Sequence, residues 1–287
     1  MKALPRLKSY FVTPYLTFAA ALGLYAFYRF VSGFDLGWFG AALTTLPIVS
    51  LVAVAMMFKR VARTRARMPA LVGLGILGVG LSAYAYVAGT SDAGALSAAL
   101  VGFGLFLVYD LWYSDLGRAP SATLEVGRRL PIFTVEDEDG VRVRADRFFG
   151  GPTLFLFYRG NWCPFCMAQI GELAGQYEEL VRRGVSVVLI SPQPHGHTRA
   201  LARKFDLPFH FLVDVDNRAA EMLGIVARGG LPLGLELFGY ETDTVLPTVI
   251  LTDAEGEVRW VDETDNYRVR PEPATFLRAL DARLDTA

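Results

Sequence analysis

The sequence predicts a chain in two parts: an α-helical bundle of four membrane spans, followed by an α/β domain. Hydrophobic residues make up 53% of the 287 residues, a high share for a soluble protein. Four apolar stretches, each about the ~20 residues that cross a bilayer, fill the first part. Short apolar runs then alternate with helical periodicity, which is typical of a partly parallel sheet layered with helices. We expect the membrane domain at 1–116, a linker at 117–129 and the α/β domain at 130–287.

The membrane domain contains four predicted spans joined by short loops. Glycine is frequent in the third and fourth spans, as expected where membrane helices approach one another closely. Asp110, near the end of the fourth span, marks either a site or, more simply, a solvated helix end. The spans cover residues 10–31, 36–58, 69–89 and 93–113.

Basic residues predict how these spans are oriented. They precede the first span and fill the loop between the second and third: Lys2, Arg6, Lys8, Lys59, Arg60, Arg63, Arg65 and Arg67. The other two loops are short and carry Asp35 and Asp92. The positive-inside rule therefore predicts a multi-pass protein with its N-terminus in the cytoplasm. Four crossings return the C-terminal domain to the same side.

The distribution of charge limits the partners of each part. Residues 1–118 carry a net charge of +6, and the remainder carries −7. An acidic second part makes nucleic acid an unsuitable partner, because phosphate contacts need basic groups. The lipid bilayer is the expected partner of the first part.

The α/β domain holds both cysteines of the chain, Cys163 and Cys166. An apolar run at 153–158 predicts a buried strand before them. Apolar residues at helical spacing from Met167 to Leu180 predict a helix after them. Helix N-termini favour the thiolate form of cysteine. Because the pair lies at the predicted start of this helix, we interpret it as a reactive dithiol. A stabilising disulfide is disfavoured, because so short a loop removes little chain entropy.

Metal binding is the other interpretation of the pair. A structural zinc site needs about four ligands, and His195 and His197 would have to complete it. We predict no metal and no cofactor. The remaining elements of the domain support a mixed sheet: strands at 132–135, 141–143, 185–190, 209–213, 249–251 and 258–261, with helices at 198–205, 217–223 and 275–284.

Five stretches of the second part carry a family resemblance: 130–133 with 139–140, 155–166, 246–253, 258–260 and 265–271. Through them, residues 127–287 resemble the alkyl hydroperoxide reductase C/thiol-specific antioxidant (AhpC/TSA) family. The resemblance implies a thioredoxin-like, peroxiredoxin-like fold and a thiol-based antioxidant enzyme. It does not explain the membrane domain.

Departures from the family pattern bear on the mechanism. The family's Pro-x-x-x-Thr-x-x-Cys motif places Cys166 at the peroxidatic position and Cys163 at the threonine. Arg159 then stands at the proline, and Pro247 stands about where a distant arginine is expected. These changes resemble thioredoxin, in which a Trp-Cys-x-x-Cys motif (here starting at Trp162) faces a cis-proline loop. We therefore expect a cis Leu246–Pro247 peptide bond.

Two mechanisms assign the two sulfurs differently. In thiol–disulfide exchange, Cys163 attacks a protein disulfide and Cys166 resolves the mixed disulfide. In a peroxidase, a hydroperoxide oxidises Cys166 and Cys163 condenses with the sulfenic acid. Arg159 would lower the pKa of either thiol, Trp162 would shield the site, and Pro247 would dock the partner.

We expect exchange as the main activity and peroxide reduction as the alternative. Both need a cytosolic thiol reductant, either thioredoxin or a low-molecular-weight thiol. A further alternative is a metal-binding or redox-sensing module that regulates the bundle. The apolar insertion at 229–244 covers the active site, rests on the membrane or packs within the domain.

Overall fold

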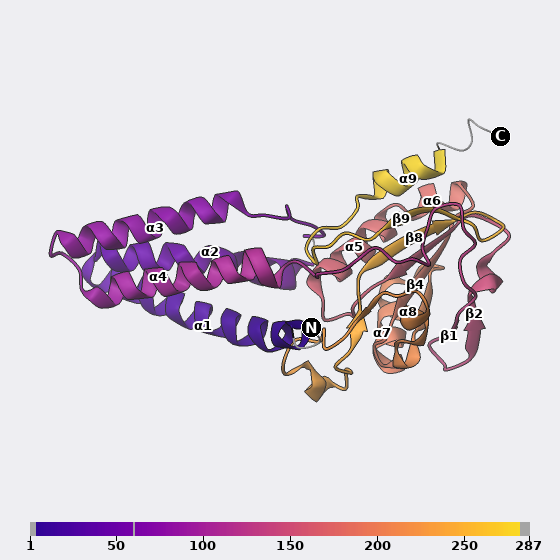
Figure 1. The fold of residues 1–287 in the computed structure, drawn as a ribbon, viewed down its shortest axis with the longest axis horizontal. Helices are drawn as coiled ribbons and strands as arrows, with labels where there is room; N and C mark the ends of the chain where they lie inside the picture. Colours follow the sequence, from indigo (N-terminus) through magenta and orange to yellow (C-terminus); the bar gives the residue numbers. More distant parts are fainter. Residues whose placement is uncertain (1–3, 60, 282–287) are drawn as a thin grey trace. The chain divides into compact units, whose positions relative to one another are not determined.

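The structure, a computed structural model, describes residues 4–59 and 61–281. They divide into two compact units. One unit contains residues 7–58 and 64–115, and the other contains residues 4–6, 59, 61–63 and 116–281. Figure 1 shows the helices of the first unit and the layered sheet of the second.

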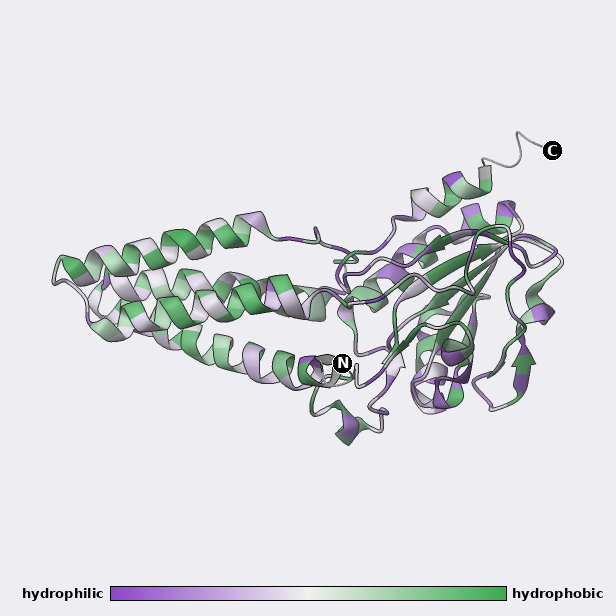
Figure 2. Ribbon diagram, in the orientation of Figure 1, coloured by the Kyte–Doolittle hydropathy of each residue, from purple (hydrophilic) through white to green (hydrophobic). Residues whose placement is uncertain are grey.

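The first unit is a bundle of four long helices, and Figure 2 shows their hydrophobic character. They are α1 (Leu4–Gly33), α2 (Leu36–Phe58), α3 (Pro69–Val87) and α4 (Ala93–Val108), which continues into a π-helical turn, η1 (Tyr109–Tyr113). All four are long and apolar enough to cross a membrane. The prediction of four spans is confirmed in that sense.

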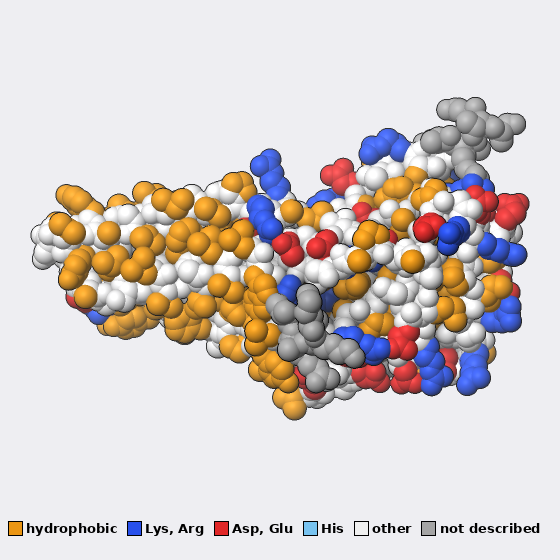
Figure 3. Space-filling view, in the orientation of Figure 1, with side chains coloured by type: hydrophobic (Ala, Val, Ile, Leu, Met, Phe, Trp, Pro, Cys, Tyr) orange, Lys and Arg blue, Asp and Glu red, His pale blue; other side chains and the backbone are white. Residues whose placement is uncertain are grey.

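Small residues bring the bundle helices together. A side chain at Gly40 would place its Cβ 2.3 Å from the carbonyl oxygen of Gly78, and one at Gly78 would lie 2.5 Å from that of Gly40. The backbones of α2 and α3 therefore touch. Ser82 Oγ also donates to the carbonyl of Gly37 at 2.7 Å. Large apolar side chains such as Leu77 and Leu100 point outward instead, and Figure 3 shows hydrophobic side chains over the surface of the helices.

The end of the fourth helix differs from the solvated end that we expected. Asp110 is buried in η1. Its carbonyl accepts a 2.7 Å hydrogen bond from Arg67 Nη1, and Arg67 also pairs with Asp115 at 2.8 Å. Arg67 therefore binds this helix end and links it to Asp115.

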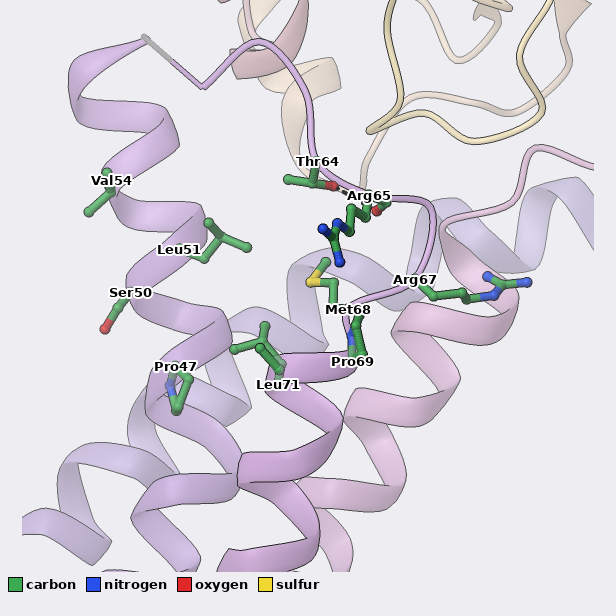
Figure 4. A pocket seen from close by; sticks show the side chains of 11 residues that line it. Pro47, Ser50, Leu51, Val54, Thr64, Arg65, Arg67, Met68, Pro69 and Leu71 are labelled. Carbon is green, nitrogen blue, oxygen red and sulfur yellow. Dashed lines mark hydrogen bonds between the residues drawn. The ribbon is translucent and has the colours of Figure 1, made fainter.

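A cavity of about 570 Å³ lies in this unit between the end of α2 and the start of α3. Leu51 and Val54 line it from α2, and Leu71 lines it from α3 (Figure 4). Arg65 projects toward Met68 in this cavity, whereas the guanidinium of Arg67 points away from it.

The second unit is built on a seven-stranded mixed sheet with the order β2-β1-β5-β4-β3-β8-β9. Strands β3, β4 and β5 run parallel, and β8 runs antiparallel beside β3. Every residue of β3 is buried, which explains its unbroken apolar sequence. The strands are β1 (Thr134–Glu136), β2 (Arg142–Arg144), β3 (Thr153–Phe157), β4 (Ser186–Ser191), β5 (His210–Val213), β8 (Thr248–Thr252) and β9 (Val258–Asp262), with a separate pair, β6 (Val226–Ala227) and β7 (Thr244–Val245).

Helices flank this sheet, as expected for a thioredoxin-like, peroxiredoxin-like fold (Figure 1). They are α5 (Pro164–Gly175), α6 (Tyr177–Arg182), α7 (His195–Phe205), α8 (Arg218–Met222) and α9 (Pro273–Asp281), with short 3₁₀ turns η2 (Ala145–Phe148), η3 (Val215–Asn217) and η4 (Leu235–Phe238). The single helix that we predicted after the cysteines is broken at Gln176. Gly171 and Gly175 precede the break, and glycine weakens a helix interior.

Aromatic and branched side chains fill the core of the second unit. Phe133 packs edge-on against Phe155 and Phe157, with ring centroids 6.0 and 5.8 Å away. Leu124, from the segment predicted as a linker, belongs to the same core. This packing fixes β3, and β3 in turn aims the loop that carries the cysteines.

Candidate active site

Both cysteines lie in the first turn of α5, immediately after β3 and its connecting loop. Cys163 is the N-cap residue, and Pro164 follows it at the first helical position. The Cys166 backbone N–H donates to Cys163 Sγ at 3.4 Å. Both side chains are free thiols, and they are only 1% and 0% exposed. A sulfur atom therefore takes the capping position that an oxygen normally holds.

The loop between β3 and α5 is shaped by a glycine. Gly160 has a φ of +147°, and a Cβ there would lie 2.6 Å from Nε1 of Trp162. Only glycine combines this backbone conformation with so close an indole. The Trp162 ring in turn lies under the guanidinium of Arg159, 4.6 Å from ring centroid to Cζ.

Arg159 is buried beside the cysteines rather than solvated. Its Nη2 donates to the carbonyl of Gly230 at 2.6 Å. Its own carbonyl accepts a hydrogen bond from Thr244 Oγ1 at 2.9 Å. The structure thus places Arg159 and Trp162 beside the thiols; their catalytic roles stay predictions.

A second arginine of the site, Arg270, was not predicted. It is buried in the tail after β9, where its Nη1 donates to the carbonyl of Val269 at 2.8 Å. Its Nε and Nη2 have no hydrogen-bond partner within the described parts of the chain. Tyr267 of the same tail packs edge-on against Phe165, 5.7 Å between ring centroids. The tail therefore covers the turn that holds the cysteines.

The surroundings drive the pKa values of the two thiols apart. Burial favours the neutral form of Cys166, but the hydrogen bond from Cys163, the charge of Arg270, the backbone N–H of Arg159 and the charge of Arg159 together outweigh it. The pKa of Cys166 falls to about 6. Burial, followed by the neighbouring Cys166, raises the pKa of Cys163 well above its usual value. Arg159 and Arg270 therefore favour the thiolate form of Cys166, whereas burial favours the neutral form of Cys163.

The structure corrects the prediction for Pro247. Among the residues that the structure describes, no peptide bond is cis, so the Leu246–Pro247 bond is trans. Pro247 directly precedes Thr248, the first residue of β8, where its missing N–H costs no ladder hydrogen bond. Its carbonyl accepts a hydrogen bond from Arg118 Nη1 at 3.0 Å, and Arg118 forms a buried ion pair with Glu263. The loop is tied into the fold and lacks the predicted cis geometry.

A polar network also supports the loop between β3 and α5. Gln193 Oε1 accepts from the Asn161 backbone N–H at 2.8 Å, and Gln193 Nε2 donates to the Tyr158 hydroxyl at 3.1 Å. Tyr240 donates to the side-chain carbonyl of Asn161. Gln193 and Tyr240 come from distant segments, and only the fold identifies them as neighbours of the site.

The apolar insertion at 229–244 has two parts. Leu231 is buried, and Tyr240 contacts the active-site loop, so the insertion packs beside the site. Leu237 and Phe238, at its tip in η4, are 89% and 67% exposed.

The histidines proposed as zinc ligands have other partners. His195 Nε2 lies 2.9 Å from Glu136 Oε2. His197 stacks on Tyr240 with 4.8 Å between ring centroids. Across residues 4–59 and 61–281, no three His, Cys, Asp or Glu residues are arranged to hold a metal ion. The geometry gives the zinc alternative no support.

Known proteins resemble the second half of the chain. A sequence model of the AhpC/TSA family matches residues 126–261. Peroxiredoxin Q, a chloroplastic protein of Sedum lineare, is 30% identical over 145 residues, which are 50% of this chain and 77% of that protein. The corresponding protein of Populus jackii is also 30% identical over 145 residues, covering 67% of its length. A solved structure, peroxidoxin BcpB from Mycobacterium tuberculosis, has a TM-score of 0.47 and 21% identity over 57% of this chain and 99% of that one.

The family match includes the stretch that contains both cysteines, β3 and the start of α5. The chain therefore belongs to the AhpC/TSA family and is a peroxiredoxin-like thiol oxidoreductase.

Proposed function

We propose that this protein is a membrane-anchored thiol peroxidase in which Cys166 is the peroxidatic residue and Cys163 is the resolving residue. The observation that carries the proposal is the pair of buried arginines beside the thiols, Arg159 and Arg270, whose charges lower the pKa of Cys166 while burial raises that of Cys163. Thiol–disulfide exchange led by Cys163, our first expectation from the sequence, would require the reverse assignment. The family relationship supports the same choice.

Burial of the thiols also favours a small oxidant. Both sulfurs lie almost completely out of solvent, so the disulfide of a folded protein cannot reach Cys166 without a rearrangement of the first turn of α5. A hydroperoxide group is close in size to two water molecules and needs far less space. The first step therefore suits a hydroperoxide better than a protein disulfide.

The proposed cycle has three steps. The Cys166 thiolate attacks one peroxide oxygen, an S–O bond forms, and the O–O bond breaks. The other oxygen leaves as hydroxide or alkoxide and takes a proton from solvent, while the sulfur becomes a sulfenic acid. The Cys163 thiol then attacks this sulfur, so that a disulfide forms and water leaves. An external thiol reductant returns two electrons and two protons and regenerates both thiols.

The geometry of the helix is compatible with this disulfide. Residues three apart in a helix have side chains on the same face, about 5–6 Å apart at Cβ. A disulfide spans Cβ atoms about 3.5–4.5 Å apart, so the two Cβ atoms must approach each other by about 1–2 Å. A modest shift of the first turn of α5 is therefore enough to join Cys163 and Cys166.

Two arginines stabilise charge in the first step. Arg270 presents buried N–H groups that lack partners among the described residues, and these can donate to the oxygen that leaves with negative charge. It would supply the guanidinium that the family resemblance placed near Pro247. Arg159 adds positive charge, and Trp162 holds its guanidinium by stacking. We assign Pro247 a positioning role, because its carbonyl accepts a hydrogen bond from Arg118.

Membrane insertion of the four helices would anchor this site at a bilayer. The basic residues before α1 and between α2 and α3 favour the cytoplasmic face for both termini. The reductant would then be a cytosolic thiol, either thioredoxin or a low-molecular-weight thiol.

The test is stopped-flow oxidation of the reduced full-length protein by hydrogen peroxide, in detergent micelles at about pH 7, where Cys166 is a thiolate. Tryptophan fluorescence provides the signal, and Trp162→Phe establishes whether the active-site indole produces it. Cys166→Ser should slow oxidation by at least about 100-fold, because no other thiolate is available. Cys163→Ser should keep the fast first step and accumulate a sulfenic acid that dimedone traps.

Two outcomes would overturn the proposal. A fast phase that survives in Cys166→Ser but disappears in Cys163→Ser would make Cys163 the nucleophile. A wild-type rate no greater than that of free cysteine would remove hydrogen peroxide as a substrate.

A further inference from the structure

Arg63 lies in the loop between α2 and α3, yet it belongs to the same compact unit as the active site. From the sequence, it is one of several basic residues that set membrane topology. In the structure its neighbour Ala62 is buried. Arg63 itself lines a cavity of about 460 Å³ together with Glu172, on α5, and residues at the start of α9.

The guanidinium of Arg63 joins two elements of the site. Its Nε donates to the carbonyl of Arg270 at 3.2 Å, and its Nη2 donates to the carbonyl of Pro271 at 3.4 Å. Nη2 also pairs with the carboxylate of Glu172. Because Glu172 lies on α5, Arg63 ties the tail that carries Arg270 to the helix that carries the cysteines.

We infer that Arg63 is a positioning residue for the thiol site, which holds Arg270 against the first turn of α5 by bridging Glu172 and the backbone of the tail. A backbone pinned at Arg270 and Pro271 leaves the buried guanidinium little freedom to move away from the sulfurs. The inference rests on the proposed role of Cys166 as the reactive thiolate.

The groups that lower the pKa of Cys166 come from three segments. Cys163 belongs to the same turn, Arg159 comes from the loop after β3, and Arg270 comes from the tail. The buried phenol of Tyr158 also faces it. Of these groups, only Arg270 is held by Arg63, so loss of Arg63 should act through Arg270 alone.

The chain offers a matched control in Arg183. Arg63 and Glu172 have side chains 26% and 31% exposed, and Arg183 and Glu179 form a pair with 27% and 24% exposed. Arg183 also donates to a backbone carbonyl, that of Leu277, at 3.4 Å. Arg183→Gln therefore removes a comparable set of bonds without touching the tail that carries Arg270.

The experiment measures the pH dependence of iodoacetamide alkylation at Cys166 in the full-length protein, with the modified residue assigned by mass spectrometry. Arg63→Gln should raise the midpoint by about half to one pH unit, which is a three- to tenfold loss of thiolate below the midpoint. Glu172→Gln removes the same bridge from the side of α5 and should shift the midpoint in the same direction. Arg183→Gln should leave it unchanged.

A double variant separates positioning from a direct effect. If Arg63 acts through Arg270, Arg63→Gln combined with Arg270→Gln should give the midpoint of Arg270→Gln alone. Additive shifts would overturn the inference, as would an Arg63→Gln shift no larger than that of Arg183→Gln. If Arg63→Gln does not fold, the midpoint of Glu172→Gln tests the same bridge. Alkylation involves no peroxide, so a failed peroxidase assay with shifted midpoints would count against the proposed function and not against this inference.

Discussion

The two units of this protein place their hydrophobic residues in opposite ways. In the helical unit, alanine and glycine take many of the buried positions, with a few large side chains such as Trp38, Ile48 and Phe106, and many other large apolar side chains are exposed. In the second unit, the redoxin unit, phenylalanine, leucine, isoleucine and valine fill much of the core, and Figure 3 shows charged side chains interspersed among other groups on its surface. Burial of large apolar groups stabilises a fold only where water is the alternative. The helical unit therefore has the distribution of apolar side chains expected of a membrane bundle, and the redoxin unit has the distribution expected of a domain in water.

The sharpest test of this comparison is a charge at two equally exposed apolar positions. Leu77 in the middle of α3 and Val181 in α6 are both 52% exposed. Leu77→Lys should cost about 3 kcal/mol of insertion free energy, because a lysine at the centre of a span enters hydrocarbon. Val181→Lys should change the unfolding free energy by less than about 0.5 kcal/mol.

Glycosylation mapping of α3 in microsomes measures the first effect, and chemical denaturation measures the second. Equal tolerance of lysine at both positions would contradict the lipid-facing interpretation.

The packing of the helical unit can be tested with two glycines of α3. Gly78→Ala forces a Cβ against the carbonyl of Gly40 and should destabilise the bundle by about 1–3 kcal/mol, as overpacking does. A Cβ at Gly80 would meet no heavy atom within 4 Å, so Gly80→Ala should stabilise by up to about 1 kcal/mol through helix propensity. Thermal unfolding in detergent distinguishes the two. Similar melting temperatures for both variants would mean that α2 and α3 do not touch at Gly78.

The smallest effect concerns the chemistry that only the redoxin unit contains. Because the pKa of Cys166 is lowered to about 6, its thiolate is fully formed above about pH 7. The thiolate is lost as the pH falls through about 6. Below that value, the thiolate fraction falls about tenfold for each pH unit, which corresponds to about 1.4 kcal/mol. Alkylation of Cys166 should follow this curve, and urea-unfolded protein should show a midpoint near that of an ordinary cysteine. A folded midpoint above about 8, close to an ordinary thiol, would contradict the charge arrangement around the sulfur.

Much of the fold could be predicted, because its signals are local. Four apolar stretches of sufficient length specify four helices, and an unbroken apolar run specifies the buried strand β3. The cysteine spacing and the start of α5 also lie within one short segment. These features need no knowledge of distant residues.

The remaining parts of the site depend on contacts that are distant in sequence. Arg270 lies far beyond Cys166 along the chain, and although its tail at 265–271 carries part of the family resemblance, the sequence does not show which residue of that tail reaches the thiols. The loop at Pro247 is held by a hydrogen bond from Arg118, far upstream. The choice between Cys163 and Cys166 as nucleophile could not be made from the sequence for the same reason, since the spacing of the two cysteines is silent about the charges that surround each one.

The positive charge around the thiols comes from arginine and not from histidine. A guanidinium stays protonated throughout the pH range in which proteins work. An imidazole in the same position would lose its charge near neutrality and would release its hold on the sulfur. The positive charge at this site therefore stays constant over that range, so a rise in pH would leave the thiolate of Cys166 in place instead of removing it.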